Sequence, residues 1–178
     1  MNELGPIILT EDQITSRVRE MGIQIANDYK NTPFVAIGIL KGAFLFLGDL
    51  AKHIDTEMSF DFMATSSYGR GTSSSGEVRI LKDLDDSIEG RHVLVVEDIV
   101  DTGLTLNYLL EVLRKREPAS LRVCCLLDKP SRRKVPVKLD YVGFEIPDVF
   151  VVGYGLDCAE VYRNLPYIAS IKTPDSGR

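Results

Sequence analysis

The sequence predicts an α/β protein in which a central, mainly parallel β-sheet is flanked by helices. Apolar stretches at residues 34–40, 93–96 and 123–127 indicate buried strands. The segments between them change to helical spacing, in which apolar residues recur every three or four positions. This alternation of strand and helix favours a parallel sheet with right-handed crossovers. A length of 178 residues suits one domain, so we expect residues 1–178 to form a single domain.

The first helix is expected at about residues 11–29. Thr10 and Gln13 have the spacing of a capping box, in which each side chain binds the backbone N–H of the other residue. An apolar stripe at helical spacing follows at Ile14, Val18, Met21 and Ile25. The stripe predicts that one face of this helix packs on the sheet.

The strand at residues 34–40 is expected to turn sharply into a helix at Lys41 and Gly42. That helix is marked by an apolar stripe at Ala43, Leu47, Leu50 and Ile54. The next strand alternates apolar and polar residues, which predicts one buried face and one exposed face. Its expected buried residues are Met58, Phe60 and Phe62, and its expected exposed residues are Glu57, Ser59 and Asp61.

A stretch rich in glycine and serine follows at residues 66–77, and we expect it to form a mobile loop. The remaining strands are expected within residues 77–84, 92–98, 120–128, 137–144, 149–154 and 167–172. A further helix is marked by Leu106, Leu109, Leu110 and Leu113. Ligands bind beyond the carboxyl ends of the strands in such sheets, so the segments that follow these ends are candidate sites.

Composition and charge indicate a soluble enzyme or binding domain. Apolar residues make up 44% of the chain and charged residues 26%, and the formal net charge is −5. General attraction to nucleic acid is therefore not expected. The first residues, MNELGPIILT, lack the basic and apolar regions of a secretory signal, and no apolar run approaches the length of a membrane span. We expect a cytoplasmic location, with no nucleic-acid partner and no membrane partner.

The cysteines and histidines do not indicate a metal or redox site. Cys124, Cys125 and Cys158 are odd in number and lack the spacing of metal ligands. Cys124 and Cys125 lie in an expected strand, where we interpret them as small core residues. His53 and His92 are isolated in the sequence, and we interpret both as structural.

Three carboxylates, those of Glu97, Asp98 and Asp101, closely follow the apolar run at residues 93–96. They could be no more than a solvated strand end with an acidic helix cap. However, two adjacent acids cannot both point into the core, so at least one of them must face an open crevice. Carboxylates this close repel one another unless a divalent cation or a polyol lies between them. The pattern therefore favours a site for sugar hydroxyls and a metal ion.

The turn that follows, at residues 101–105, predicts a phosphate site. It offers free backbone N–H groups, the hydroxyls of Thr102 and Thr105, and a helix N-terminus. It is neither a P-loop nor a dinucleotide-binding loop, because the glycine patterns of both are absent. Sugar hydroxyls and a phosphate would thus lie side by side.

The stretch VVEDIVDTGLT, residues 95–105, resembles the phosphoribosyl pyrophosphate binding motif of type I phosphoribosyltransferases. The rest of the chain resembles the hypoxanthine-guanine phosphoribosyltransferases of that family. The similar segments are Leu40-Lys41-Gly42, Ser67-Tyr68, Asp128-Lys129-Pro130 and residues 142–168. The resemblance runs in the right order from the first helix to Ile168.

The resemblance implies the type I phosphoribosyltransferase fold, with a small hood lobe and a flexible catalytic loop. The hood would be formed by the N-terminal segment and residues of about 130–178. The implied activity belongs to purine salvage: transfer of the 5-phosphoribosyl group from phosphoribosyl pyrophosphate to hypoxanthine or guanine, which gives IMP or GMP and pyrophosphate. The implied cofactor is Mg²⁺, the implied partners are these small molecules, and the implied assembly is a homodimer or homotetramer.

The resemblance also assigns roles to the acids and to the turn behind them. Glu97 and Asp98 hold the ribose hydroxyls and position Mg²⁺, and Asp157 helps hold a second Mg²⁺. Asp101 lies near N7 of the purine, where a general base fits the chemistry. The 5′-phosphate is surrounded by Thr102, Gly103, Leu104 and Thr105. Leu104 departs from the mammalian members, which carry lysine at that place.

Further residues are assigned to pyrophosphate, to the purine and to the loop. Pyrophosphate is assigned to Lys41, Gly42 and Arg163. The purine is assigned to Lys129, which donates to O6, to Phe150, which stacks on the ring, and to Val151 and Asp157. The flexible loop begins with Ser67 and Tyr68. The Leu40–Lys41 peptide bond is often cis in the family, and we treat a cis bond here as a hypothesis.

Other interpretations stay open from the sequence. Lys41 and Lys129 could be ordinary surface lysines, and Phe150 an ordinary core residue. Receiver domains of signalling proteins also place acids at parallel strand ends and use a later Lys-Pro pair, but they need neither a long Gly/Ser loop nor a tail such as residues 142–171. A regulator with the phosphoribosyltransferase fold that binds RNA or DNA is the other alternative, and the negative net charge speaks against it.

Overall fold

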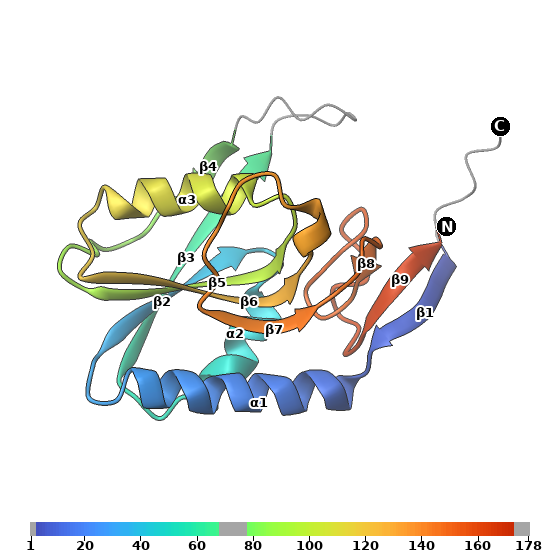
Figure 1. Ribbon diagram of the computed structural model, residues 1–178, viewed down its shortest axis with the longest axis horizontal. Helices are drawn as coiled ribbons and strands as arrows, with labels where there is room; N and C mark the ends of the chain where they lie inside the picture. Colours follow the sequence, from blue (N-terminus) through green and yellow to red (C-terminus); the bar gives the residue numbers. More distant parts are fainter. Residues whose placement is uncertain (1–2, 68–77, 173–178) are drawn as a thin grey trace.

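Two β-sheets form the framework of the molecule (Figure 1). The computed structural model describes residues 3–67 and 78–172. The larger sheet runs in the order β4 (Val78–Lys82), β3 (Met58–Ser67), β2 (Phe34–Leu40), β5 (His92–Val100), β6 (Ser120–Asp128) and β7 (Tyr141–Glu145). Its neighbouring strands are parallel except for β3 and β4, which are antiparallel. The expected α/β fold with a mainly parallel sheet is confirmed.

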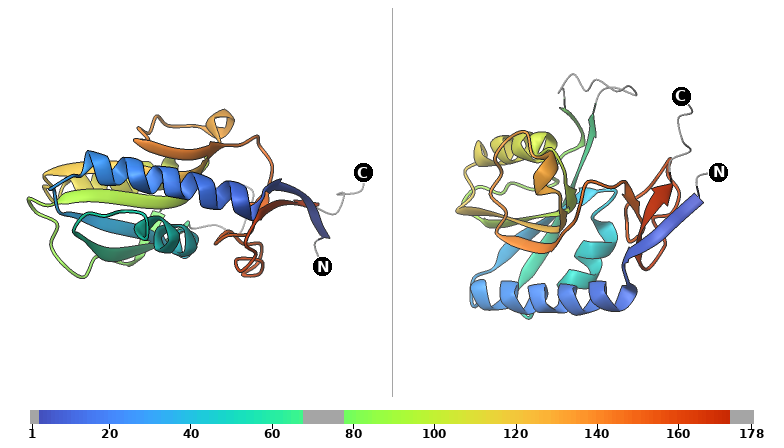
Figure 2. Two further views of the ribbon diagram at one scale, coloured as in Figure 1. Left: turned by 90° about the horizontal axis from the view of Figure 1, so that it is seen from below. Right: turned by 45° about the vertical axis from the view of Figure 1, so that its right-hand side comes forward.

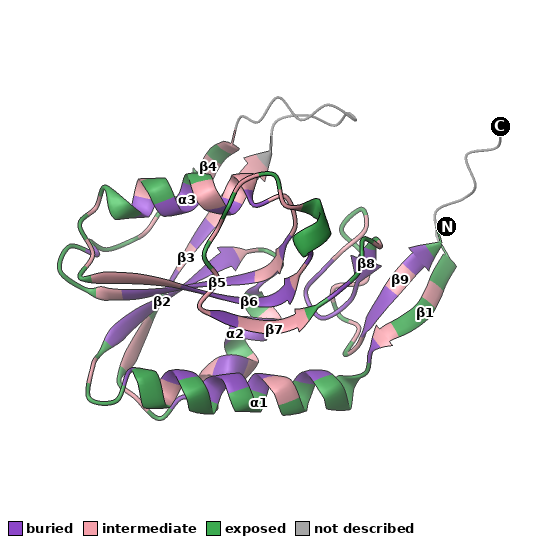
Figure 3. Cartoon of the chain, in the orientation of Figure 1, coloured by how far each residue is buried: buried purple, intermediate pink, exposed green. Residues whose placement is uncertain are grey.

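Helices cover both faces of the larger sheet (Figures 1 and 2). One face carries α1 (Glu11–Asp28) and α2 (Phe44–Ala51), and the other carries α3 (Leu104–Arg114). Successive residues of β5 point to opposite faces, so Leu94 and Val96 join the first core and Val93 and Val95 the second. Figure 3 shows the resulting buried interior between exposed outer helix faces.

The smaller sheet lies beyond the carboxyl ends of the central strands (Figure 1). It is antiparallel and runs in the order β1 (Glu3–Leu9), β9 (Ile168–Lys172) and β8 (Val151–Val152). The sequence did not predict β1, because this strand pairs with β9 near the opposite end of the chain. Gly5 and Pro6 also weaken its local signal, although proline is tolerated in an edge strand.

The chain leaves the larger sheet only after β7. The stretch from about residue 130, which the prediction assigned to the hood, therefore contains an edge strand of the larger sheet. This strand continues the parallel ladder of β6, with Cys124 opposite Tyr141 and Asp128 opposite Glu145. The assignment of residues 1–178 to one domain with a hood stays a prediction.

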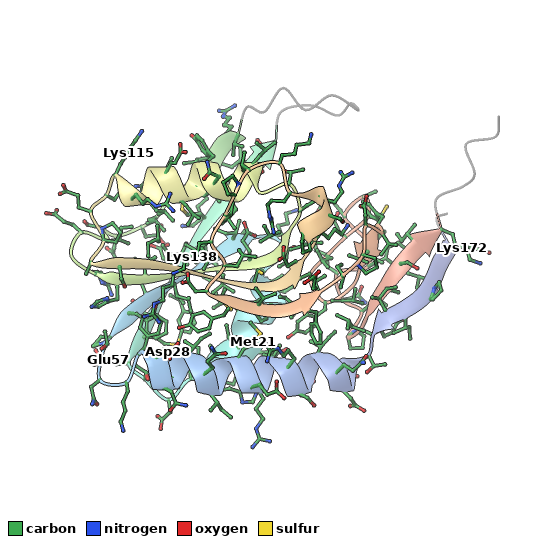
Figure 4. The ribbon with its side chains drawn as sticks, viewed as in Figure 1. Met21, Asp28, Glu57, Lys115, Lys138 and Lys172 are labelled. Carbon is green, nitrogen blue, oxygen red and sulfur yellow. The ribbon has the colours of Figure 1, made fainter. Side chains whose placement is uncertain are left out.

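The local signals of α1 are confirmed. Thr10 Oγ1 accepts a hydrogen bond from the backbone N–H of Gln13 at 3.3 Å, and Gln13 Oε1 accepts one from the backbone N–H of Thr10 at 2.9 Å. Met21, labelled in Figure 4, lies on the sheet-facing side of the helix and is fully buried. Cys124 and Cys125 are also fully buried, in β6, as the sequence predicted.

The predicted burial pattern of β3 is wrong. Asp61 is buried, and Phe60 is 52% exposed. Asp61 is buried because it is used as an anchor: its Oδ2 accepts a hydrogen bond from the backbone N–H of Asp85 at 2.9 Å, and its Oδ1 lies 3.6 Å from Lys82 Nζ. The carboxylate thus ties the segment after β4 to β3.

The described ranges leave one expectation untested. Residues 68–77, which include Tyr68 and most of the Gly/Ser stretch, lie outside the described residues, so the mobile loop stays a prediction. Within the described ranges, no helix is both long enough and apolar enough to cross a membrane.

Removing the cap of α1 is expected to destabilise the fold. Thr10→Ala removes an acceptor from the first turn, which costs about 1 kcal/mol at such positions. Ser16→Ala changes an exposed residue of the same helix and serves as the control. Urea unfolding of both variants measures the difference, and equal midpoints would show that the cap contributes nothing.

Candidate active site

The site begins with two acids at the end of β5. Residues 93–96 of this strand are fully buried between β2 and β6, and Glu97 and Asp98 follow them within the last residues of β5. Glu97 is 7% exposed and Asp98 is partly buried. Asp98 Oδ1 accepts a hydrogen bond from the backbone N–H of Ile99 at 2.8 Å. The sheet therefore fixes two neighbouring carboxylates in a position largely removed from water.

Burial changes the proton affinity of both acids. It raises the pKa of Asp98 from its ordinary value of 3.8 to about 6, against the opposing effects of its backbone hydrogen bonds and the charge of Arg163. Burial, and then the charge of Asp98, raises the pKa of Glu97 well above its ordinary value. A cation or sugar hydroxyls at this place would favour the charged forms of both carboxylates.

The Lys41 turn crosses directly beside Asp98. A Cβ atom on Gly42 would collide with the Asp98 carboxylate, and a Cβ atom on Gly155 would collide with the carbonyl oxygen of Gly42. Both positions therefore require glycine for close approach. The peptide bond between Leu40 and Lys41 is cis, as hypothesised. The turn is thus packed between Asp98 in β5 and the segment around Gly155, which follows β8.

Carboxylate oxygens are the ligands that Mg²⁺ prefers, and Mg²⁺ usually keeps waters and substrate phosphates in its remaining positions. Glu97 and Asp98 fit this chemistry. In the part of the chain that the structure describes, no cluster of three or more metal-binding side chains is preformed. Asp157 instead pairs with Arg163, with 2.8 Å between Oδ1 and Nη2. The assignment of Glu97, Asp98 and Asp157 as metal ligands therefore stays a prediction.

The turn behind the acids encloses a cavity of about 110 Å³. Gly103 has the left-handed φ of +81° and precedes the first residue of α3, which has no side-chain cap. The backbone N–H of Leu104 donates to Thr102 Oγ1 at 3.4 Å, and the N–H groups of the next residues of this first turn lack partners within the helix and are available to an anion. The cavity is lined by Glu97, Ile99, Val100, Asp101, Thr102, Gly103, Thr105 and Leu106. Of the four residues predicted to surround the 5′-phosphate, Leu104 alone is outside this lining.

The predicted pyrophosphate residues meet in a network of charges. Lys41 Nζ lies 2.7 Å from Glu160 Oε2, and Arg163 Nη2 lies 3.3 Å from Glu160 Oε1. Arg163 Nη1 also donates to the carbonyl oxygen of Gly155 at 2.7 Å. The Nε atom of Arg163 is buried and has no hydrogen-bond partner among the described residues. The two cations thus lie close together, and one buried donor remains for a ligand.

Lys129 of the predicted purine residues follows β6, on the other side of β5 from Lys41, whereas Asp157 pairs with Arg163 among the predicted pyrophosphate residues. Lys129 is 6% exposed, so the surface-lysine interpretation of this residue is wrong. Its Nζ donates to the carbonyl oxygen of Val149 at 2.6 Å, and its backbone N–H donates to Val100 at 3.0 Å. Phe150 is 53% exposed and Val151 is buried, so Phe150 is not an ordinary core residue. The hydrogen bond from Lys129 to Val149 thus holds the Lys129 side chain beside the residue that precedes Phe150.

Three residues of this region were missed from the sequence. Glu160 pairs with the predicted pyrophosphate cations, and Arg132 Nε lies 3.1 Å from Asp101 Oδ1. Arg133 forms an ion pair with Asp128 and donates to the carbonyl oxygen of Asp101 at 3.0 Å. The basic run at residues 131–134 was the available signal for the arginines. Ser67 ends β3, while Tyr68 lies outside the described residues, so the roles of both stay predictions.

Comparison with known proteins identifies the family. The sequence model of the phosphoribosyl transferase domain matches residues 7–159. The chain is 54% identical over 171 residues to a hypoxanthine-guanine phosphoribosyltransferase of Bacillus subtilis, a match that covers 96% of this chain and 95% of the relative. The chain belongs to the hypoxanthine-guanine phosphoribosyltransferase family. The receiver-domain alternative is therefore wrong, and this protein is a phosphoribosyltransferase enzyme.

Solved structures agree with this family assignment. A hypoxanthine phosphoribosyltransferase of Staphylococcus aureus superposes with a TM-score of 0.91 at 53% identity, covering 95% of this chain and 92% of the other. A Trypanosoma cruzi hypoxanthine phosphoribosyl transferase superposes with a TM-score of 0.90 at 46% identity, covering 95% and 92%. The type I phosphoribosyltransferase fold that the resemblance implied is therefore confirmed.

A larger hollow of about 760 Å³ lies at the opposite end of the strands of this phosphoribosyltransferase. Figure 4 labels one of its residues, Glu57, near the start of β3. The hollow is lined by Lys30, Asn31, Thr32, Pro33, Ile54, Asp55, Thr56 and Glu57. None of these residues belongs to the predicted site, which lies at the carboxyl ends of the strands.

Asp98→Asn is expected to stabilise the ligand-free phosphoribosyltransferase at pH 8. The carboxyl has a pKa of 3.8 when unperturbed and about 6 in the folded protein, so the folded state binds more protons between these values. The stability of the parent protein therefore falls as the pH rises from about 4 through 6. The variant lacks this loss, and its advantage at pH 8 is expected to be about 1 to 3 kcal/mol.

Urea unfolding at pH 4 and pH 8 measures this effect. Asp86→Asn, at an exposed position, is the control and should show no such pH dependence relative to the parent. A variant that is less stable than the parent at pH 8 would contradict the unfavourable burial of the Asp98 charge.

Proposed function

We propose that this phosphoribosyltransferase acts in purine salvage, transferring the 5-phosphoribosyl group from phosphoribosyl pyrophosphate to hypoxanthine or guanine. The products are IMP or GMP and pyrophosphate. The observation that carries the proposal is that the buried Glu97 and the partly buried Asp98 lie a few residues before a helix N-terminus whose N-cap residue, Gly103, has no side chain. The carboxylates can accept hydrogen bonds from ribose hydroxyls, and the N–H groups at the start of the helix can donate to a 5′-phosphate. The names of the relatives support the choice of bases.

The reaction makes a bond from purine N9 to C1 of the sugar and breaks the bond from C1 to pyrophosphate. Glu97 and Asp98 hold the ribose, and the turn at residues 101–105 holds the 5′-phosphate. Asp101 takes the proton from purine N7. Lys41 and the unpaired Nε of Arg163 receive the departing anion, which needs positive charge as it forms.

Lys129 and Phe150 select the base. The ammonium of Lys129 has three N–H donors, of which one is used by Val149, so further donors can reach the O6 atom of a 6-oxopurine. Adenine presents an amine at that place, and a donor facing a donor is left unpaired. Phe150 is exposed enough to stack on the purine ring.

Mg²⁺ belongs to the proposal as the cofactor. Glu97 and Asp98 would hold one ion and Asp157 a second, and the ions would supply charge neutralisation of the pyrophosphate. A cytoplasmic location and a homodimer or homotetramer are also proposed. The relative from Trypanosoma cruzi was studied for the role of its C-terminal region in oligomeric state and activity, which makes assembly a feature to measure here.

The base preference is tested by incubating the protein with phosphoribosyl pyrophosphate, Mg²⁺ and one base at a time. Hypoxanthine and guanine are expected to yield nucleotide and an equal amount of pyrophosphate, while adenine and uracil yield none. Xanthine is included because its use is open. Chelation of Mg²⁺ by EDTA is expected to stop the reaction. Adenine turnover equal to that of hypoxanthine would overturn the assignment.

Lys129→Gln is expected to lose the preference for 6-oxopurines. A charged donor to O6 is replaced by a neutral group, and hydrogen bonds to charged groups contribute about 1.5 to 3 kcal/mol. The value of kcat/KM for hypoxanthine should therefore fall about 10- to 100-fold. Lys138→Gln, at a lysine that pairs with Asp140, is the control. Unchanged hypoxanthine kinetics in the Lys129 variant would contradict its role.

A further inference from the structure

The segment after β6 holds the turn after β5 through three successive carbonyl groups. The carbonyl oxygen of Val100 accepts from the backbone N–H of Lys129 at 3.0 Å, and that of Thr102 accepts from the backbone N–H of Lys134 at 2.9 Å. Between them, the carbonyl oxygen of Asp101 accepts from Arg133 Nη1 at 3.0 Å. The backbone on both sides of the proposed base is therefore fixed.

These bonds do not fix the carboxylate of Asp101, but Arg132 contacts it. Arg132 ends the short helix η1 (Pro130–Arg132), which Figure 1 shows beside the turn that leads into α3. Its Nε lies 3.1 Å from Asp101 Oδ1. Among the described residues, no side chain is paired with the second oxygen, Oδ2. One oxygen is thus held and the other remains to accept a proton.

The same guanidinium reaches toward the segment that carries Phe150. Arg132 Nη1 lies 3.6 Å from Asp148 Oδ2, two residues before that aromatic ring. Arg132 therefore contacts both the proposed base and the segment before β8 that carries the proposed stacking residue. A planar guanidinium can contact two carboxylates at once in a defined geometry, whereas a lysine ammonium acts as a single point of charge.

We propose that Arg132 is a positioning residue that holds the Asp101 carboxylate where its free oxygen meets the N7 proton of the bound purine. The inference rests on the proposed function and deepens it. In the step concerned, the N7 proton moves to Asp101 Oδ2 and the electron pair of the N–H bond stays in the ring. N9 then uses its electron pair to bond C1, and the pair of the C1–O bond leaves with pyrophosphate.

The charges around Asp101 are consistent with a positioning role. Arg132 faces its side chain and Arg133 its backbone, while Asp148 and Asp128 are the respective partners of these two arginines. Each arginine therefore has an acidic partner other than Asp101. The Asp101 side chain is partly exposed, so the free energy of folding should depend little on its pair with Arg132. The effect of losing Arg132 is therefore expected in catalysis rather than in stability.

The test measures steady-state kinetics of Arg132→Gln and Arg132→Lys in the full chain. Arg132→Gln is expected to lower kcat with hypoxanthine about tenfold while KM for phosphoribosyl pyrophosphate changes less than twofold. Arg132→Lys should recover part of the loss, because it restores charge without the planar contact. The control is Arg116→Gln, which breaks a remote pair in which Nη2 lies 2.8 Å from Asp83 Oδ2.

A second readout separates positioning from a general structural defect. 8-Azaguanine carries an extra ring nitrogen, which makes its ring N–H more acidic than that of guanine and reduces the need for a base. If Arg132 acts through Asp101, the loss in kcat of Arg132→Gln should be clearly smaller with 8-azaguanine than with guanine. A structural defect would slow both substrates by the same factor, and that result would overturn the inference.

Failure of the inference and failure of the proposed function give different results. If the parent protein forms no nucleotide from hypoxanthine or guanine, the proposed function is wrong. If the parent protein is active and Arg132→Gln has the kcat of the Arg116→Gln control, the proposed function stands and the positioning role of Arg132 is wrong.

Discussion

The site depends on one unfavourable placement: two adjacent carboxylates, Glu97 and Asp98, at the end of a buried strand. The larger sheet imposes this placement, because β5 lies between β2 and β6 and its last fully buried residues immediately precede the acids. In the ligand-free protein the cost appears as raised pKa values, whose first cause is burial. A ligand that brings positive charge or hydroxyl donors recovers that cost. The two acids thus lower the folding stability of the ligand-free protein and favour ligand binding, a trade-off that is common at functional sites.

The rest of the site is arranged around these acids by segments from distant parts of the chain. Gly42 lets its backbone approach the Asp98 carboxylate closely, and Gly155 lets its own backbone approach that of Gly42. The segment after β6 fixes the turn that follows β5, and it also supplies the buried Lys129. The smaller sheet, at the carboxyl ends of the strands, carries Val151 in β8, next to Phe150. Parallel strand ends collect such segments at one edge of the sheet, which is why the chemistry gathers there.

Much of the fold and part of the site could be predicted from the sequence, because their signals are local. The cap at Thr10, the stripe of α1 and the acids near the end of β5 each lie within a single short stretch of the chain. The strand β1, the burial of Asp61 and the contacts of Glu160 and Arg132 could not be predicted. Each depends on a partner far away in the chain, such as β9 for β1 and Lys41 for Glu160. A sequence pattern records which residues are polar, and only the fold determines which of them meet.

The central claim is that Glu97 and Asp98 bind the ribose of the phosphoribosyl donor together with a metal ion. Isothermal titration calorimetry with phosphoribosyl pyrophosphate, in the presence and absence of Mg²⁺, measures this directly on the parent protein and on a variant with Glu97→Gln and Asp98→Asn together. The account predicts saturable, Mg²⁺-dependent binding to the parent protein and a loss of at least about tenfold in affinity for the variant, because hydrogen bonds to charged groups are removed. Equal affinity of the two proteins, or no saturable binding to the parent protein, would contradict it.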